Sequence, residues 1–77
     1  MNNISVIGLK YVGLHTAVLS ASKGLKVVGV DVDASKIKAV NGGRCYLREP
    51  SLAELLRDMV SKGFLRAADV VRAVKEV

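Results

Sequence analysis

The sequence predicts an α/β fold: half of a doubly wound parallel sheet with helices on its faces. Two observations lead to this fold class. Short apolar runs alternate with amphipathic segments along the chain, as strands and helices do around a parallel sheet. A loop with the sequence GLKYVG joins the first apolar run to the first amphipathic segment. Right-handed crossovers between the runs predict the strand order 3-2-1.

The length and composition predict one small domain over residues 1–77. Hydrophobic residues make up 51% of the chain, which is typical of parallel strands buried on both faces. The formal net charge of +5 is spread along the sequence, and only three aromatic residues accompany it. A nucleic-acid partner is therefore not expected. No apolar run approaches the length of a membrane span, so no membrane partner is expected either.

The first half of the chain contains two predicted strands around one helix. Ile4–Gly8 is an apolar run ending in glycine, which predicts a buried strand. A helix over Val12–Lys23 follows, because its apolar residues recur with helical spacing. Gly24 stands where a left-handed helix end is favoured. Lys26–Asp31 then predicts a second strand, again apolar on both faces.

The next segment predicts a short helix and a loop. Asp33 is a favourable N-cap for a helix over Ala34–Asn41. Two glycines end this helix, and Arg44–Pro50 is expected to form a loop. Cys45 in the loop is the only cysteine, so an internal disulfide is excluded and a cytoplasmic location is expected. We expect its side chain to be small, semi-buried and without a catalytic role, and no metal-ligand spacing accompanies it.

A capping box predicts the start of the third helix. Ser51 would cap the helix while Glu54, three residues later, reaches back to the same turn. The apolar residues that follow lie on one helical face as far as Lys62.

The end of the chain predicts a third strand and a last helix. Phe64–Ala67 is a short apolar stretch, and Asp69 would cap a helix that continues to about Glu76. With the order 3-2-1, Ile4–Gly8 becomes an edge strand of the sheet. An apolar edge offers unpaired N–H and C=O groups, so we expect self-association or pairing through this edge.

The loop GLKYVG resembles the glycine fingerprint of Rossmann domains. Gly8 would make the tight turn out of the strand, and Gly13 would allow close packing of helix on strand. The N-terminus of the helix offers free N–H groups to a pyrophosphate. Asp31 ends the next strand and can accept hydrogen bonds from ribose hydroxyls, which favours NAD over NADP.

Lys10 is a departure from this fingerprint, because it replaces the middle glycine. Its side chain would crowd the pyrophosphate, or its backbone would need angles that suit lysine poorly. Alternatively, its flexible stem could swing aside and bring a positive charge to a phosphate. The steric effect acts in every conformer, so we expect weakened NAD binding.

Several motifs in order resemble the N-terminal segment of the nucleotide-sugar dehydrogenases, the UDP-glucose/GDP-mannose dehydrogenase family. These motifs are GLKYVGLHTAVLSASKGLKVVGVDVD, RCYLREPSLAELL and SKGFLRAAD. The resemblance covers essentially the whole chain, and the last motif favours the UDP-N-acetyl-D-mannosamine dehydrogenase branch. It implies NAD as cofactor and a partial NAD-binding Rossmann domain, the first mononucleotide-binding half.

The family oxidises the C6 alcohol of a UDP-sugar to the uronate with two NAD+. By position, the resemblance implies that Tyr11 and Val12 face NAD and that Asp31 holds its ribose. Lys36 matches a basic position that contacts NAD; a solvated lysine on the helix face is the alternative. The catalytic and sugar-binding parts of the family lie beyond this span. No catalytic residue is therefore assigned, and a UDP-sugar is expected as partner only in a full-length context.

His15 is a further departure, because the family has proline there. Imidazolium is disfavoured at a helix N-terminus, so His15 is expected to be neutral and without a role; a phosphate contact is the alternative. Two functions remain open. One is the NAD-binding segment of a dehydrogenase; the other is a non-catalytic Rossmann remnant or interaction module that has lost NAD through Lys10 and truncation. Whether the chain is an enzyme is left open.

Overall fold

A computed structural model describes residues 3–75, with side chains as far as Arg72. Three strands and four helices follow one another in the predicted order, and their bounds within residues 3–75 lie within one or two residues of those expected. The elements are β1 (Asn3–Ile7), α1 (Tyr11–Ser22), β2 (Lys26–Val30), α2 (Ala34–Asn41), α3 (Pro50–Ser61), β3 (Leu65–Ala68) and α4 (Val70–Lys75).

The three strands form one parallel sheet in the order β1-β2-β3, which confirms the predicted order 3-2-1. Ile7 pairs with Val30, and Val30 pairs with Ala68, so the strands end level with one another. The carboxyl ends of all three strands therefore lie together at one end of the sheet, which we call its carboxyl edge to distinguish it from the open side of β1. This arrangement is half of a doubly wound sheet, a partial Rossmann fold.

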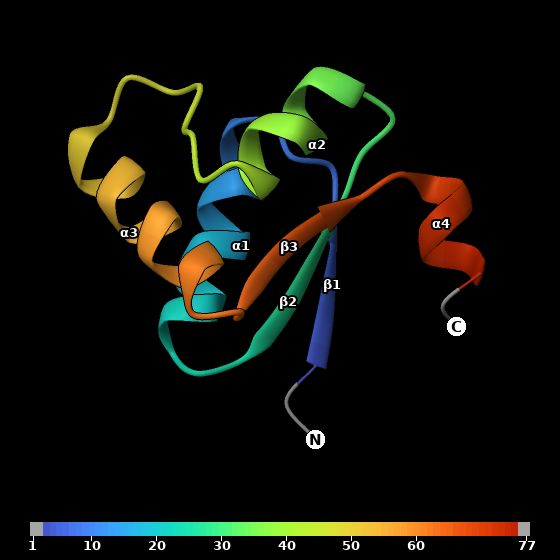
Figure 1. Cartoon of the computed structure of the whole chain (residues 1–77), viewed down its shortest axis with the longest axis horizontal. Coiled ribbons are helices and arrows are strands. Elements are labelled where there is room, and N and C mark those ends of the chain that lie inside the picture. Colours follow the sequence, from blue (N-terminus) through green and yellow to red (C-terminus); the bar gives the residue numbers. More distant parts are fainter. Residues whose placement is uncertain (1–2, 76–77) are drawn as a thin grey trace.

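Helices α1, α2 and α3 form a layer on one side of the strands, and α4 lies on the other side (Figure 1). The helical spacing of apolar residues in α1 predicted which face of this helix points inward. The structure confirms it, because the four residues on that face are all buried. This face packs against β2 and α3, where Leu56 is fully buried. The core thus lies between the sheet and this helical layer, and its α1 face consists of Leu14, Ala17, Val18 and Ala21.

The prediction that the first strand is buried on both faces is wrong. Side chains in β1 alternate between exposed and half-buried, and Ile7 is 78% exposed. Ile4 and Val6 face the helical layer and pack on the core. The reason is that β1 has a neighbouring strand on one side only, and that α1, α2 and α3 cover only the face of the sheet to which Ile4 and Val6 point (Figure 1).

The start of α3 also differs from the prediction, because no capping box forms. Glu49 is the N-cap residue, its side chain makes no capping bond, and Pro50 occupies the first turn. Ser51 therefore lies inside the helix and is exposed. The fixed φ of proline suits the first helical position, and its missing N–H needs no acceptor there.

The other two predicted caps are confirmed. Asp33 accepts a hydrogen bond from the backbone N–H of Ser35 at 2.9 Å. Asp69 accepts one from the backbone N–H of Arg72 at 2.6 Å. The predicted end of the last helix at Glu76 lies outside the described residues. Gly24 has a φ of +91°, which confirms the left-handed end of α1.

Candidate functional site

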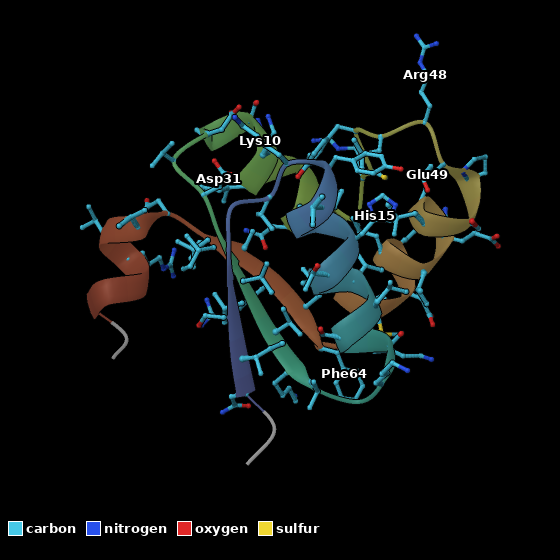
Figure 2. All side chains as sticks on the ribbon, turned by 180° about the vertical axis from the view of Figure 1, so that it is seen from behind. Lys10, His15, Asp31, Arg48, Glu49 and Phe64 are labelled. Carbon is cyan, nitrogen blue, oxygen red and sulfur yellow. The ribbon has the colours of Figure 1, made fainter. Side chains whose placement is uncertain are left out.

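A pocket of about 540 Å³ opens at the carboxyl edge of the sheet. Six of the seven residues predicted to bind the cofactor line it, and the whole lining comes from three separate segments of the chain. We call it the carboxyl-edge pocket; its lining consists of Ile7, Gly8, Lys10, Tyr11, Val12, Gly13, Val30, Asp31, Val32 and Val70. Figure 2 shows Lys10 and Asp31 at this end of the molecule, far from Phe64.

Gly8 and Gly13 have the roles predicted for them. Gly8 leaves β1 with a φ of +92°, a conformation that side chains other than glycine rarely adopt, and it turns the chain into the loop. A Cβ on Gly13 would lie 1.8 Å from the carbonyl oxygen of Gly8. The N-terminus of α1 therefore lies directly against the end of β1, which only a glycine at position 13 permits.

Leu9 anchors the loop between these two glycines. Its side chain is fully buried over Gly29, where an added Cβ would lie 2.5 Å from a Leu9 methyl carbon. The backbone N–H of Leu9 donates to Asp31 at 2.8 Å, and its carbonyl accepts a hydrogen bond from the Tyr46 hydroxyl. The loop is thus held through the backbone of one residue, Leu9, by the residue that follows β2 and by the loop that precedes α3.

The sequence reasoning missed this anchor. Tyr46 lies 37 residues from Leu9, and no local spacing connects the two. Burial raises the pKa of Tyr46 to about 12, with the nearby Asp31 carboxylate adding to the shift, so its hydroxyl stays protonated and donates. The sequence did contain one signal for the position of Leu9. Gly29 lies inside an apolar strand, and such a glycine often marks a place where another part of the chain packs closely on the strand.

Asp31 has a structural task in addition to the predicted one. Oδ2 accepts from the N–H of Leu9, and Oδ1 accepts from the N–H of Asp33 at 2.9 Å. These two bonds, the first above all, hold the pKa of Asp31 below its ordinary value. Each carboxylate oxygen can accept more than one hydrogen bond, so Asp31 keeps acceptor capacity toward a ribose in the pocket.

Lys10 adopts an ordinary backbone conformation, with φ of −76° and ψ of −163°. The expectation that its position needs angles unsuited to lysine is therefore wrong, because the positive φ of the loop falls on Gly8. Lys10 is the N-cap residue of α1, and a lysine side chain carries no acceptor for the N–H groups of the first turn. No acidic side chain lies in that turn, so its N–H groups remain available to an anion.

Lys36 is the one predicted cofactor residue that does not line the pocket. Its ammonium lies 3.1 Å from Oδ2 of Asp33 and 5.4 Å from the centre of the Tyr46 ring. Its ammonium therefore forms a partly exposed ion pair at the start of α2. Its charge is the smallest of the contributions that lower the pKa of Asp31, after the backbone hydrogen bonds of the Asp31 carboxylate. The contact between Lys36 and NAD stays a prediction.

His15 has partners on both sides of its ring, contrary to the expectation of a neutral residue without a role. Nδ1 lies 2.7 Å from the carbonyl oxygen of Tyr11, and Nε2 lies 3.0 Å from a carboxylate oxygen of Glu49. These two bonds raise the pKa of His15 above its ordinary value of 6.5. The Glu49 carboxylate offsets the unfavourable effect of the helix N-terminus on a protonated imidazole. Glu49 lies outside α1, so the sequence of that helix alone could not reveal this partner.

The remaining expectations concern cysteine, metals and membranes. Cys45 is half-buried, and its Sγ lies 3.5 Å from the carbonyl oxygen of Leu47, which confirms a semi-buried residue. Among the described residues, no group of three or more His, Cys, Asp or Glu side chains could hold a metal ion. Within the same residues, no helix has the length and apolar character needed to span a membrane.

The pocket wall suits a dinucleotide in shape and chemistry. Val32 is 85% exposed and Val12 is 73% exposed, although both are apolar. With Val70 they form an apolar wall against which a flat aromatic ring can pack. The free N–H groups of α1 fit a pyrophosphate, and Asp31 fits a ribose. The residues of the chain therefore match the base, the ribose and the pyrophosphate of one half of a dinucleotide.

Comparison with known proteins agrees with this geometry. Residues 2–77 match the sequence model of the UDP-glucose/GDP-mannose dehydrogenase family, NAD binding domain. The chain belongs to this family. Its domain is the NAD-binding one, so NAD is its cofactor. The alternative of a remnant that no longer binds NAD is not favoured.

Individual relatives lie on several branches of the family. The NDP-N-acetyl-D-galactosaminuronic acid dehydrogenase of Ralstonia nicotianae is 47% identical over 64 residues, which are 83% of this chain and 15% of the relative. The UDP-N-acetyl-D-mannosamine dehydrogenase of Escherichia coli K12 is 45% identical over 65 residues, 84% of this chain and 16% of the relative. The predicted mannosamine branch is thus among its relatives.

Solved structures show the same relationship. The UDP-D-ManNAc dehydrogenase of Pyrococcus horikoshii superposes with a TM-score of 0.85 at 39% identity, over 94% of this chain and 17% of that one. A ternary complex of GDP-mannose dehydrogenase from Pseudomonas aeruginosa gives a TM-score of 0.82 at 37% identity, over 88% and 15%. The chain spans about one sixth of the length of the relatives it matches.

Proposed function

We propose that the carboxyl-edge pocket binds NAD through residues of this chain. The first turn of α1 and Lys10 face the pyrophosphate, Asp31 accepts hydrogen bonds from the adenosine ribose, and Val32 and Val70 contact the adenine. The single observation that carries this assignment is the convergence of Gly8, Gly13 and Asp31, which lie apart in sequence, on one pocket.

The role of the domain in catalysis is part of the same proposal. We propose that residues 1–77 are the first mononucleotide-binding half of a dehydrogenase that oxidises the C6 alcohol of a UDP-sugar to the uronate. Two NAD+ accept the two hydrides. The family membership supports this reaction, and the catalytic and sugar-binding groups would come from outside these residues. A cytoplasmic location follows from a substrate and a cofactor of that compartment.

Calorimetric titration with NAD+ tests the pocket, using the wild type, Lys10→Ala and Lys10→Gly. Lys10→Ala removes the ammonium and keeps Cβ, whereas Lys10→Gly removes both. We expect NAD+ to bind the wild type, because the backbone angles of Lys10 are unstrained. Tighter binding in both variants would mean that the long side chain crowds the phosphates. Weaker binding in both would mean that its charge assists.

The controls separate the site from the fold. Asp31→Ala should abolish NAD+ binding, while Asp58→Ala, an exposed acid on α3 paired with Lys62, should not. NADP+ should bind about tenfold more weakly than NAD+, because its 2′-phosphate meets the Asp31 carboxylate. If circular dichroism shows folded protein and NAD+ binds neither the wild type nor a Lys10 variant, the proposed function is wrong.

We also propose that the open edge of β1 pairs with another strand, either in a second copy or elsewhere in a longer chain. The exposure of Ile7 and the position of β1 at the edge of the sheet support this. Sedimentation velocity should show association that rises with concentration. Ser5→Lys places a charge on β1 and should reduce it, whereas Ser61→Lys on α3 should not. A folded monomer at high concentration would refute pairing between copies.

A further inference from the structure

A histidine and a glutamate join the first turns of α1 to the start of α3, beside the carboxyl-edge pocket. His15 lies on α1, and Glu49 precedes α3. Their side chains approach to 3.0 Å between Nε2 and Oε1. Figure 2 shows His15 and Glu49 facing one another, while Arg48 points away into solvent. The pair lies 34 residues apart in sequence and belongs to no motif of the glycine loop.

The geometry of the two hydrogen bonds determines the charge of His15. One ring nitrogen faces the carbonyl oxygen of Tyr11 at 2.7 Å, and the other faces a carboxylate oxygen of Glu49. Both partners are acceptors, and neutral imidazole has only one N–H to donate. Both bonds therefore form together only in the imidazolium.

His15 also contacts Tyr11 through its ring. The two ring centroids lie 4.5 Å apart at an interplanar angle of 47°. Tyr11 is 60% exposed and lines the carboxyl-edge pocket. His15 thus contacts both the backbone carbonyl and the ring of Tyr11, and Glu49 holds His15 in turn.

We propose that His15 is a positioning residue of the NAD site, whose imidazolium bridges Tyr11 to Glu49 and so keeps Tyr11 at the pocket wall. This inference rests on the proposed binding of NAD in that pocket. Loss of the ring proton breaks the bridge, so NAD+ affinity falls as the pH rises through the titration of His15. The side chain contributes no direct contact to the cofactor.

The charged and titratable groups around His15 are few among the described residues. Glu49 faces it from the start of α3, Tyr11 precedes it on α1, and Lys10 is the N-cap residue of that helix. Arg48 points away from it, and the strands meet α1 through the apolar core. A pH effect on Tyr11 near neutrality therefore traces to His15, because imidazole is the side chain among these groups that ordinarily titrates near neutral pH.

The experiment uses the 77-residue chain, in which His15 is the only histidine. NMR follows the His15 ring and the Tyr11 ring from pH 5 to 9, and calorimetry measures NAD+ affinity at the same pH values. The dissociation constant of the wild type should rise about threefold to tenfold as His15 loses its proton. His15→Ala should bind at every pH as the wild type does at high pH, and His15→Gln should bind without pH dependence.

Two glutamate variants supply the matched pair. Glu49→Gln should lower the pH at which His15 titrates and move the binding profile with it. Glu54→Gln, an exposed acid on α3, removes the same charge and should leave both unchanged. A wild-type affinity that is equal above and below the His15 titration overturns the inference. If NAD+ binds neither the wild type nor any variant at any pH, the proposed function is wrong, and no effect of His15 on NAD+ affinity exists. The NMR signals of the Tyr11 ring then test the contact from His15 to Tyr11 by themselves. These signals must follow the His15 titration in the wild type, and their midpoint must move together with that of His15 in Glu49→Gln.

Discussion

Replacement of Gly13 by alanine is a direct test of how α1 lies on β1. The new Cβ would lie 1.8 Å from the Gly8 carbonyl oxygen and 2.8 Å from its carbonyl carbon. An ordinary contact begins at about 3.4 Å, so the helix and the strand must separate. The atoms in the way belong to backbone, and no side-chain rotation can relieve them.

The expected cost follows from this overlap. Overpacking in a well-packed region costs about 1–3 kcal/mol, and a clash with backbone belongs at the upper end of that range. Alanine returns at most about 1 kcal/mol through its better helix propensity. We expect Gly13→Ala to lower the free energy of unfolding by about 2 kcal/mol, a large share of the roughly 4–12 kcal/mol of a domain this size.

Urea denaturation followed by circular dichroism measures the change, and two variants calibrate it. Gly8→Ala meets no atom within 4 Å but keeps a φ of +92°, so only backbone strain of about 1–2 kcal/mol is expected. Thr16→Ala, exposed on the same helix, should change stability by less than about 0.5 kcal/mol. A Gly13→Ala protein as stable as Thr16→Ala would refute the close packing of α1 on β1.

Three further predictions concern the anchor of the loop. Tyr46→Phe removes the hydrogen bond to the Leu9 carbonyl and should cost about 1 kcal/mol in thermal unfolding, so an unchanged melting temperature would contradict the anchor. Leu9→Ala empties a fully buried position and should cost about 2–5 kcal/mol in the same assay; a loss below 1 kcal/mol would mean that the loop is held without its side chain. Asp31 has a lowered pKa, so its contribution to stability is complete above its ordinary value of 3.8 and is lost as the pH falls through the folded value. In Asp31→Asn, the free energy of unfolding should therefore fall less steeply with decreasing pH below pH 4 than in the wild type. An equally steep fall in both proteins would count against the two backbone hydrogen bonds of Asp31.

Much of the fold could be predicted because its signals are local. The apolar runs, the helical spacing of Leu14 to Ala21 and the cap at Asp33 lie within single elements, and the structure confirms them. The errors occurred where a neighbour in space decided the outcome. Ile7 is exposed because β1 lies at the edge of the sheet, and Ser51 caps nothing because Pro50 starts the helix.

The candidate site divides in the same way. The glycine spacing and Asp31 were readable in sequence, since each follows a strand and strand ends of a parallel sheet share one edge. The bonds from Tyr46 to Leu9 and from Glu49 to His15 were not, since each joins segments more than 30 residues apart. Lys36 also could not be placed, because its pairing with Asp33 depends on the conformation of both side chains.

The sequence by itself determined the order of the elements, the glycine turn and the family to which the chain belongs. These depend on the spacing of residue types along the chain, which survives single changes such as Lys10. Only the tertiary structure decided how that loop is held and what its departures do. Lys10 is unstrained because Gly8 takes the positive φ. The pKa of His15 is raised because the Tyr11 carbonyl and the Glu49 carboxylate both accept from its ring. The pKa of a side chain depends on groups from distant segments of the chain, and these groups become neighbours only when the protein folds.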